Sequence, residues 1–120
     1  IFNNGVGKIG WQRNKLTVQN MELQKQQAER TLKQDIYKSY TDATTAIQKF
    51  NASKKSVQTA EKAYNYAQKR YDLGLLPTID FLTNQNNLTR SKLELALSQV
   101  DYVFRLKLLE FYKGQGIKLQ

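Results

Sequence analysis

Apolar residues recur every seven positions along most of this chain. In the first half, the repeating positions are Ile36, Ala43, Phe50, Val57, Tyr64 and Tyr71. Three positions later a second series contains only small residues, namely Ser39, Ala46, Ser53, Ala60 and Ala67. A large residue beside a small one lets two helices approach closely, and a strict period of seven implies left-handed supercoiling. The pattern therefore predicts a helix that packs along this seam in a coiled coil.

The second half of the chain carries two such patterns on different faces. One row, with the same period of seven, consists of Phe81, Leu88, Leu95, Tyr102 and Leu109. The other row consists of Leu93, Leu97, Val100, Phe104 and Phe111. Because a helix with two apolar faces buries both, we expect this helix to contact more than one neighbour.

A single strong helix-breaking signal separates the two halves. Gly74 is followed three residues later by the only proline of the chain, Pro77, which is typical of a helix end and a restart. Thr78 is expected to cap the second helix, with Asp80 in its first turn. The predicted fold is all-α: a long antiparallel α-helical hairpin with helices over 11–73 and 78–113 and a tip turn at 74–77. The flanking segments, 1–10 with three glycines and 114–120, are predicted as linkers.

Folding the chain at Gly74 predicts which residues meet. The pairs should be symmetric about a point near residue 75, with Tyr64 close to the region of Leu88. The predicted helix seam consists of Ile36, Phe50, Val57, Tyr64, Leu88, Leu95 and Tyr102. Residues 11–35 find no partner in this arrangement, because the second helix is too short to reach them. We expect something outside this segment to cover them.

The formal net charge of +9 leaves several partners open. An excess of basic residues is compatible with binding to nucleic acid, to an anionic membrane or to an acidic protein. It is equally compatible with a solvated helix surface that binds nothing. No apolar run approaches the ~20 residues of a membrane-spanning helix. The chain starts at Ile1 with no signal-peptide pattern, so we expect a segment of a longer protein.

Catalysis has little support in the sequence. The chain contains no histidine and no cysteine, and its ten acidic residues are dispersed. We therefore expect no enzyme, no catalytic or metal site and no cofactor. Residues 5–10 match the glycine pattern of dinucleotide-binding loops, but no strand precedes them, so a flexible entry to the helix is the better interpretation. Tyrosines beside lysines could stack on bases, but Tyr64 and Tyr71 belong to the seam.

The tip has two open interpretations. Leu75 and Leu76 are apolar residues at an exposed bend. They either contact another protein or fold back onto Tyr71 and Ile79.

Several of these residues together resemble a known family. Phe2-Asn3-Asn4-Gly5 before a very long helix is similar to the junction between barrel and helix in TolC-like outer-membrane efflux proteins, also called outer-membrane factors. The tip and return segment of that family resembles an ordered set here: Arg70, Tyr71, Gly74, Thr78, Asp80, Leu82, Gln85, Leu88, Leu95, Tyr102, Leu109 and Gly114. The resemblance covers essentially the whole chain.

The resemblance implies a trimeric channel for transport. Such proteins combine an outer-membrane β-barrel with a periplasmic α-barrel, whose hairpin tips narrow the entrance and meet a periplasmic adaptor (membrane fusion) protein. An inner-membrane pump completes the path. This chain would be a periplasmic helical segment without the barrel strands, with residues 1–10 as the linker from the β-barrel. Residues 11–35 would contact another repeat or another protomer.

By position in the resemblance, Tyr71 and Asp72 correspond to the periplasmic entrance. Gly74, Leu75, Leu76 and Pro77 correspond to the adaptor-docking tip. Some relatives carry a basic residue just after the tip glycine, where leucines stand here, so a charged latch is not expected. Pro77 should stiffen the turn.

The predicted function is therefore an efflux segment that conducts substrates from the periplasm and docks to an adaptor, with no nucleic-acid partner. The alternative is a basic coiled-coil arm that binds nucleic acid or an anionic membrane. Such an arm would carry lysine and arginine on one stripe clear of the seam and bind in a salt-sensitive way.

Overall fold

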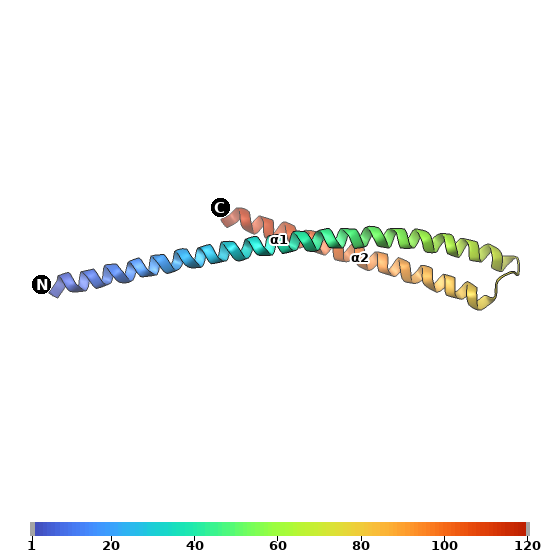
Figure 1. The fold of residues 1–120 in the computed structure, drawn as a ribbon, viewed down its shortest axis with the longest axis horizontal. Helices are drawn as coiled ribbons and strands as arrows, with labels where there is room; N and C mark the ends of the chain where they lie inside the picture. Colours follow the sequence, from blue (N-terminus) through green and yellow to red (C-terminus); the bar gives the residue numbers. More distant parts are fainter. Residues whose placement is uncertain (1, 120) are drawn as a thin grey trace.

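Two long helices make up the part of the chain that the structure, a computed structural model, describes, which is residues 2–119. Helix α1 spans Phe2–Asp72 and helix α2 spans Thr78–Leu119. They run antiparallel and form a hairpin with extents of 108 × 23 × 14 Å. Figure 1 shows α2 folding back along the C-terminal part of α1, while the N-terminal part of α1 continues beyond it. The predicted all-α antiparallel hairpin is confirmed.

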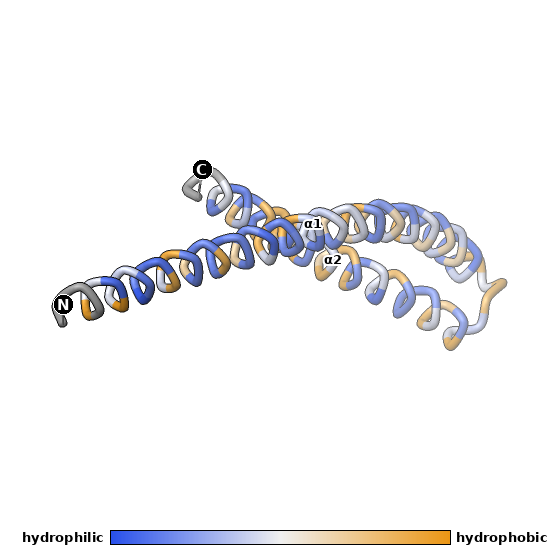
Figure 2. The backbone as a smooth tube through the Cα atoms, turned by 60° about the vertical axis from the view of Figure 1, so that its left-hand side comes forward, coloured by the Kyte–Doolittle hydropathy of each residue, from blue (hydrophilic) through white to orange (hydrophobic). Residues whose placement is uncertain are grey.

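The hairpin has a narrow core, confined to the seam between the helices. The buried residues are Ser39, Ala43, Ala46, Val57 and Ala67 on α1, and Leu88, Ser98 and Leu109 on α2. All of them fall on positions that repeat every seven residues. Figure 2 shows the apolar residues as separate bands along both helices, because each helix returns to the seam only once per turn or so. The hydroxyl of buried Ser98 donates to the carbonyl oxygen of Leu95 at 2.9 Å, so burial leaves it hydrogen bonded.

The register of the hairpin follows from three contacts. The rings of Phe50 and Tyr102 stack with centroids 5.9 Å apart, and those of Tyr71 and Phe81 stack at 4.6 Å. Nearer the C-terminus, Gly116 lies against the Ile36 side chain: a Cβ on Gly116 would be 3.5 Å from Cδ1 of Ile36. Each pair is symmetric about residue 76, in agreement with the predicted point near residue 75. The seam residues Val57 and Leu88 are buried, and the side chains of Ile36, Phe50, Tyr64, Leu95 and Tyr102 are half-buried.

The predicted linkers at 1–10 and 114–120 are wrong where the structure describes them. Helix α1 already begins at Phe2, and α2 continues to Leu119. The glycines suggested breaks, but a glycine in a helix interior costs only ~1 kcal/mol relative to alanine. Among the described glycines only Gly74 has a positive φ, so the others adopt ordinary helical geometry.

The N-terminal part of α1 lacks a partner in the chain, in keeping with the prediction for residues 11–35. Its large apolar side chains are exposed, among them Trp11, Leu16, Met21 and Leu23. Helix α2 comes close to this region only at its C-terminal end, where Tyr112 shares an open groove with Leu32. Within residues 2–119, no helix combines the length and apolar character needed to cross a membrane.

Candidate docking tip

A glycine-dependent turn ends helix α1. Gly74 has φ 73°, in the left-handed region that favours glycine. The Gly74 amide donates to the carbonyl of Tyr71 at 2.9 Å, and the Leu75 amide donates to the carbonyl of Arg70 at 2.8 Å. This pair of bonds defines a Schellman motif, which satisfies carbonyls that the helix end would otherwise leave unpaired. Gly74 therefore fixes the direction in which the chain leaves α1.

Helix α2 begins differently from the prediction. The Pro77 carbonyl accepts hydrogen bonds from the amides of Asp80 and Phe81, both at 3.1 Å. Pro77 therefore occupies the cap position, and Thr78 is the first helical residue rather than the cap. The Thr78 hydroxyl instead donates to the Tyr71 hydroxyl in a long contact of 3.5 Å. Asp80 lies in the first turn, as predicted, where its charge favours the helix dipole.

Three aromatic rings join the two helices directly behind the turn. Phe81 stacks on Tyr71 at 4.6 Å with 13° between the ring planes, and it also meets Tyr64 at 5.7 Å in a tilted arrangement. Offset aromatic pairs of this kind contribute ~0.5–1.5 kcal/mol beyond the area they bury. The cluster fixes the spacing between the end of α1 and the start of α2, and so restricts the position of the turn that joins them.

The turn itself exposes apolar side chains. Leu73 is 73% exposed, Leu75 63% and Ile79 72%, while Leu76 is half-buried. In a Schellman motif, the residue after the glycine often packs on an apolar side chain one turn back. Here Lys69 and Arg70 stand at those positions, so Leu75 has no apolar side chain to pack on. The sequence left open whether these leucines fold back onto the hairpin or remain free for another protein. Leu76 is half-buried, as expected for partial folding back, whereas Leu75 is exposed and does not fold back.

Charged residues surround this apolar turn. Lys69 and Arg70 lie in the last turn of α1, where positive charge favours the C-terminal end of the helix dipole. The Arg70 guanidinium lies 5.8 Å from the centre of the Tyr66 ring. Asp72, the last residue of α1, is exposed. An apolar centre with a charged rim is the usual composition of a protein-binding surface.

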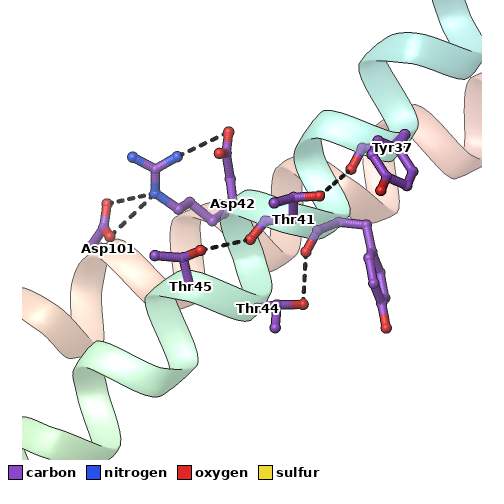
Figure 3. A network of polar contacts seen from close by, with 8 residues as sticks. Tyr37, Thr41, Asp42, Thr44, Thr45 and Asp101 are labelled. Carbon is purple, nitrogen blue, oxygen red and sulfur yellow. Dashed lines mark hydrogen bonds and ion pairs between the residues drawn. The ribbon is translucent and has the colours of Figure 1, made fainter.

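A second polar feature lies far from the tip and was not predicted. Arg105 stands at a seam position of α2, where its Nε donates to both oxygens of Asp101 at 3.1 and 3.2 Å. Its Nη1 lies 3.4 Å from Oδ2 of Asp42 on α1. Figure 3 shows this network, beside which Thr41, Thr44 and Thr45 each donate to a carbonyl one turn back. The sequence could have indicated that Arg105 lies in the seam, because it belongs to a series that repeats every seven residues: Asn84, Ser91, Ser98, Arg105 and Tyr112.

The described residues show no group of three or more acidic side chains placed to hold a metal ion. The tip offers exposed apolar side chains, backbone groups already paired in the turn, and flanking charges.

The structure is therefore a long helical hairpin with an exposed apolar turn. The family model described as outer membrane efflux protein matches residues 1–114. The chain belongs to this family, which confirms the resemblance. No curated protein and no solved structure matches the chain.

Proposed function

We propose that this chain is part of the helical wall of an outer-membrane efflux channel and that its tip docks to a periplasmic adaptor protein. Membership of the outer membrane efflux protein family supports the channel. The observation that carries the docking proposal is the outward position of Leu75 on a hydrogen-bonded turn at one end of a molecule 108 Å long. In this proposal the segment lies in the periplasm of the cell and an inner-membrane pump is reached through the adaptor.

The second apolar face of α2 supports a wall made of many helices. Its five residues are between 58% and 68% exposed: Leu93, Leu97, Val100, Phe104 and Phe111. A contiguous apolar row of this length marks an interaction surface rather than scattered surface leucines. Since this face points away from the seam, α2 lies between two neighbours. A helix between two neighbours on nearly opposite sides belongs to a single layer, as in the wall of a homotrimeric α-barrel.

The tip residues take two roles in this proposal. Tyr71 and Asp72 end α1 and line the periplasmic entrance, where Asp72 supplies charge. Gly74, Leu75 and Pro77 form the docking turn, with Leu76 half-buried beneath it. An apolar side chain held on a preorganised turn binds with little loss of conformational entropy, which favours a helical partner such as an adaptor hairpin.

The alternative, a basic arm for nucleic acid or anionic membrane, gains no support from the family match. Two of the basic residues make contacts within the hairpin. Arg105 lies in the seam, and Lys54 lies over the Phe50 ring, 4.3 Å from its centre.

Leu75→Asp in the full-length protein tests the docking proposal. A carboxylate at the centre of an apolar contact loses its hydration, so adaptor binding should fall at least tenfold and drug efflux should fail. Trimer yield and membrane insertion should remain normal. The matched control is Asn65→Asp, which adds the same charge on an exposed position of α1 away from the turn. Normal efflux by the Leu75 variant would show that the tip is not the docking surface.

A further inference from the structure

The N-terminal end of α1 carries positive charge that no nearby acidic residue balances. Residues 1–21 contain three basic residues, Lys8, Arg13 and Lys15, and no aspartate or glutamate. The remaining basic residues of the chain are interspersed with all ten acidic ones. Figure 1 shows this end at the opposite end of the molecule from the turn that joins the helices. We call residues 6–15 the basic end.

Trp11 lies between two of these lysines on one face of the helix. Lys8, Trp11 and Lys15 are three and four residues apart, so their side chains are neighbours along this face. The Nζ atom of Lys15 lies 5.2 Å from the centre of the Trp11 ring, and Trp11 is 62% exposed. An open groove runs along the same face from Trp11 to Val18. Exposed tryptophan beside lysine is typical of the headgroup level of a membrane, where the ring is amphipathic and the ammonium group meets phosphate.

Apolar side chains cover the other side of this end. Val6, Ile9 and, one residue beyond the basic end, Leu16 are exposed and lie away from the Trp11 face. Arg13 lies among them. The end of the helix therefore presents apolar and positively charged groups on all sides. This mixture suits a boundary between water and an apolar phase, where long basic side chains keep their charge in water and bury their stems.

A second helix is a poor match for the Trp11 face. This face continues the seven-residue series of the seam, but Lys8 and Lys15 stand at positions that hold large apolar residues such as Phe50 further along. A helix packed there would cover two ammonium groups, and the basic end supplies no acidic partner for them. Burial of unpaired charge is costly. On a lipid surface the ammonium groups stay hydrated beside phosphates, while the Trp11 ring leaves water.

We propose that the basic end of α1 binds the anionic phospholipid headgroups of the outer membrane on its periplasmic side. Lys8, Arg13 and Lys15 contact the phosphates, and the Trp11 ring lies at the boundary with the acyl chains. The helix rises ~10 Å from Lys8 to Lys15, which is comparable with a headgroup layer of ~5–8 Å. This inference rests on the proposed function, which directs the tip into the periplasm and the opposite end of α1 toward the outer membrane. It differs from a basic arm because only one end of the chain contacts lipid.

Trp11 reports on this contact, because it is the only tryptophan of the chain. Its fluorescence is measured with vesicles of brominated phosphatidylcholine, either pure or mixed with an equal part of brominated phosphatidylglycerol. Bromine atoms quench tryptophan at short range. The vesicles that contain phosphatidylglycerol should quench Trp11 and shift its emission to shorter wavelength, and added salt should weaken both effects. Equal quenching by pure phosphatidylcholine would overturn the proposal.

A triple variant tests the three basic residues. Lys8→Gln, Arg13→Gln and Lys15→Gln together should weaken binding to the phosphatidylglycerol vesicles about tenfold or more, because each basic residue near an anionic surface contributes roughly fivefold. Glutamine is a good helix former, so these exposed substitutions should leave the helix intact, as circular dichroism can verify.

The matched control removes the same charge from the next part of α1. Lys25, Arg30 and Lys33 are also exposed, and their replacement with glutamine should change binding by no more than about twofold, because salt screens charges that lie more than about 10 Å from the lipid. Equal losses in the two variants would assign the binding to net charge alone and refute a local contact. No binding by the unsubstituted helical chain would refute it as well.

Cross-linking in cells tests the same contact in the full-length protein. The photoreactive amino acid benzoylphenylalanine replaces either Gln12 or Gln26, which lies two repeats of seven later on the same side of α1. Irradiation should attach phospholipid at position 12 and not at position 26. Attachment at position 26, or at neither position, would contradict the proposal. Because this measurement does not depend on transport, it can fail while Leu75→Asp still abolishes efflux, and the failures of the two proposals are therefore distinguishable.

Discussion

Replacing Gly74 with alanine should destabilise the hairpin, although the added methyl group has room. A Cβ at Gly74 would meet no atom within 4 Å, so steric overlap with neighbours is not the cause. The cost comes from the backbone, because φ is 73° and an L-residue in this region clashes with its own carbonyl. The expected loss is ~1–2 kcal/mol, which is a large part of the stability of a structure with so narrow a core.

Gly114→Ala is the matched control and should change stability in the opposite direction. A Cβ there also meets nothing within 4 Å, but Gly114 lies inside α2 with helical geometry. Alanine restricts the unfolded chain and favours the helix, so this variant should gain ~0.5–1 kcal/mol. The same chemical change in equally open surroundings therefore has opposite signs at the two positions.

Urea unfolding followed by far-ultraviolet circular dichroism, at one fixed chain concentration, measures both changes. The midpoint for Gly74→Ala should fall and that for Gly114→Ala should rise, with slopes close to that of the unsubstituted chain. Equal shifts in the same direction would refute the reasoning, because they would show that helix propensity alone controls both positions. An unchanged midpoint for Gly74→Ala would mean that the turn can form with a different backbone.

Two further outcomes follow from the surfaces that the chain leaves uncovered. The isolated chain should self-associate through the second apolar face of α2. The double variant Leu97→Lys and Phe104→Lys should therefore lower the mass measured by sedimentation toward that of a monomer. An unchanged mass would exclude this face as the contact. Amide hydrogens in residues 11–35 should exchange much faster than those around Val57, because no second helix packs there; equal protection in a monomer would contradict the unpartnered arrangement.

The sequence alone determined the class of fold and most of the seam. A seven-residue period depends only on residue spacing, and a glycine followed by a proline interrupts a helix regardless of its surroundings. These local rules were sufficient to predict two helices, the turn at Gly74 and the pairing of the two helices to within one residue. They misplaced the outer helix ends, because the cost of a glycine in a helix is small enough for neighbouring residues to override.

The tertiary structure decided how side chains from different segments meet. Whether Leu75 is covered depends on whether a side chain of α2 reaches it, and the structure leaves it 63% exposed. Arg105 became notable only when Asp42, 63 residues earlier in the chain, was placed 3.4 Å away. Contacts between distant residues depend on the relative rotation and offset of the two helices, and the spacing within either helix does not contain that information.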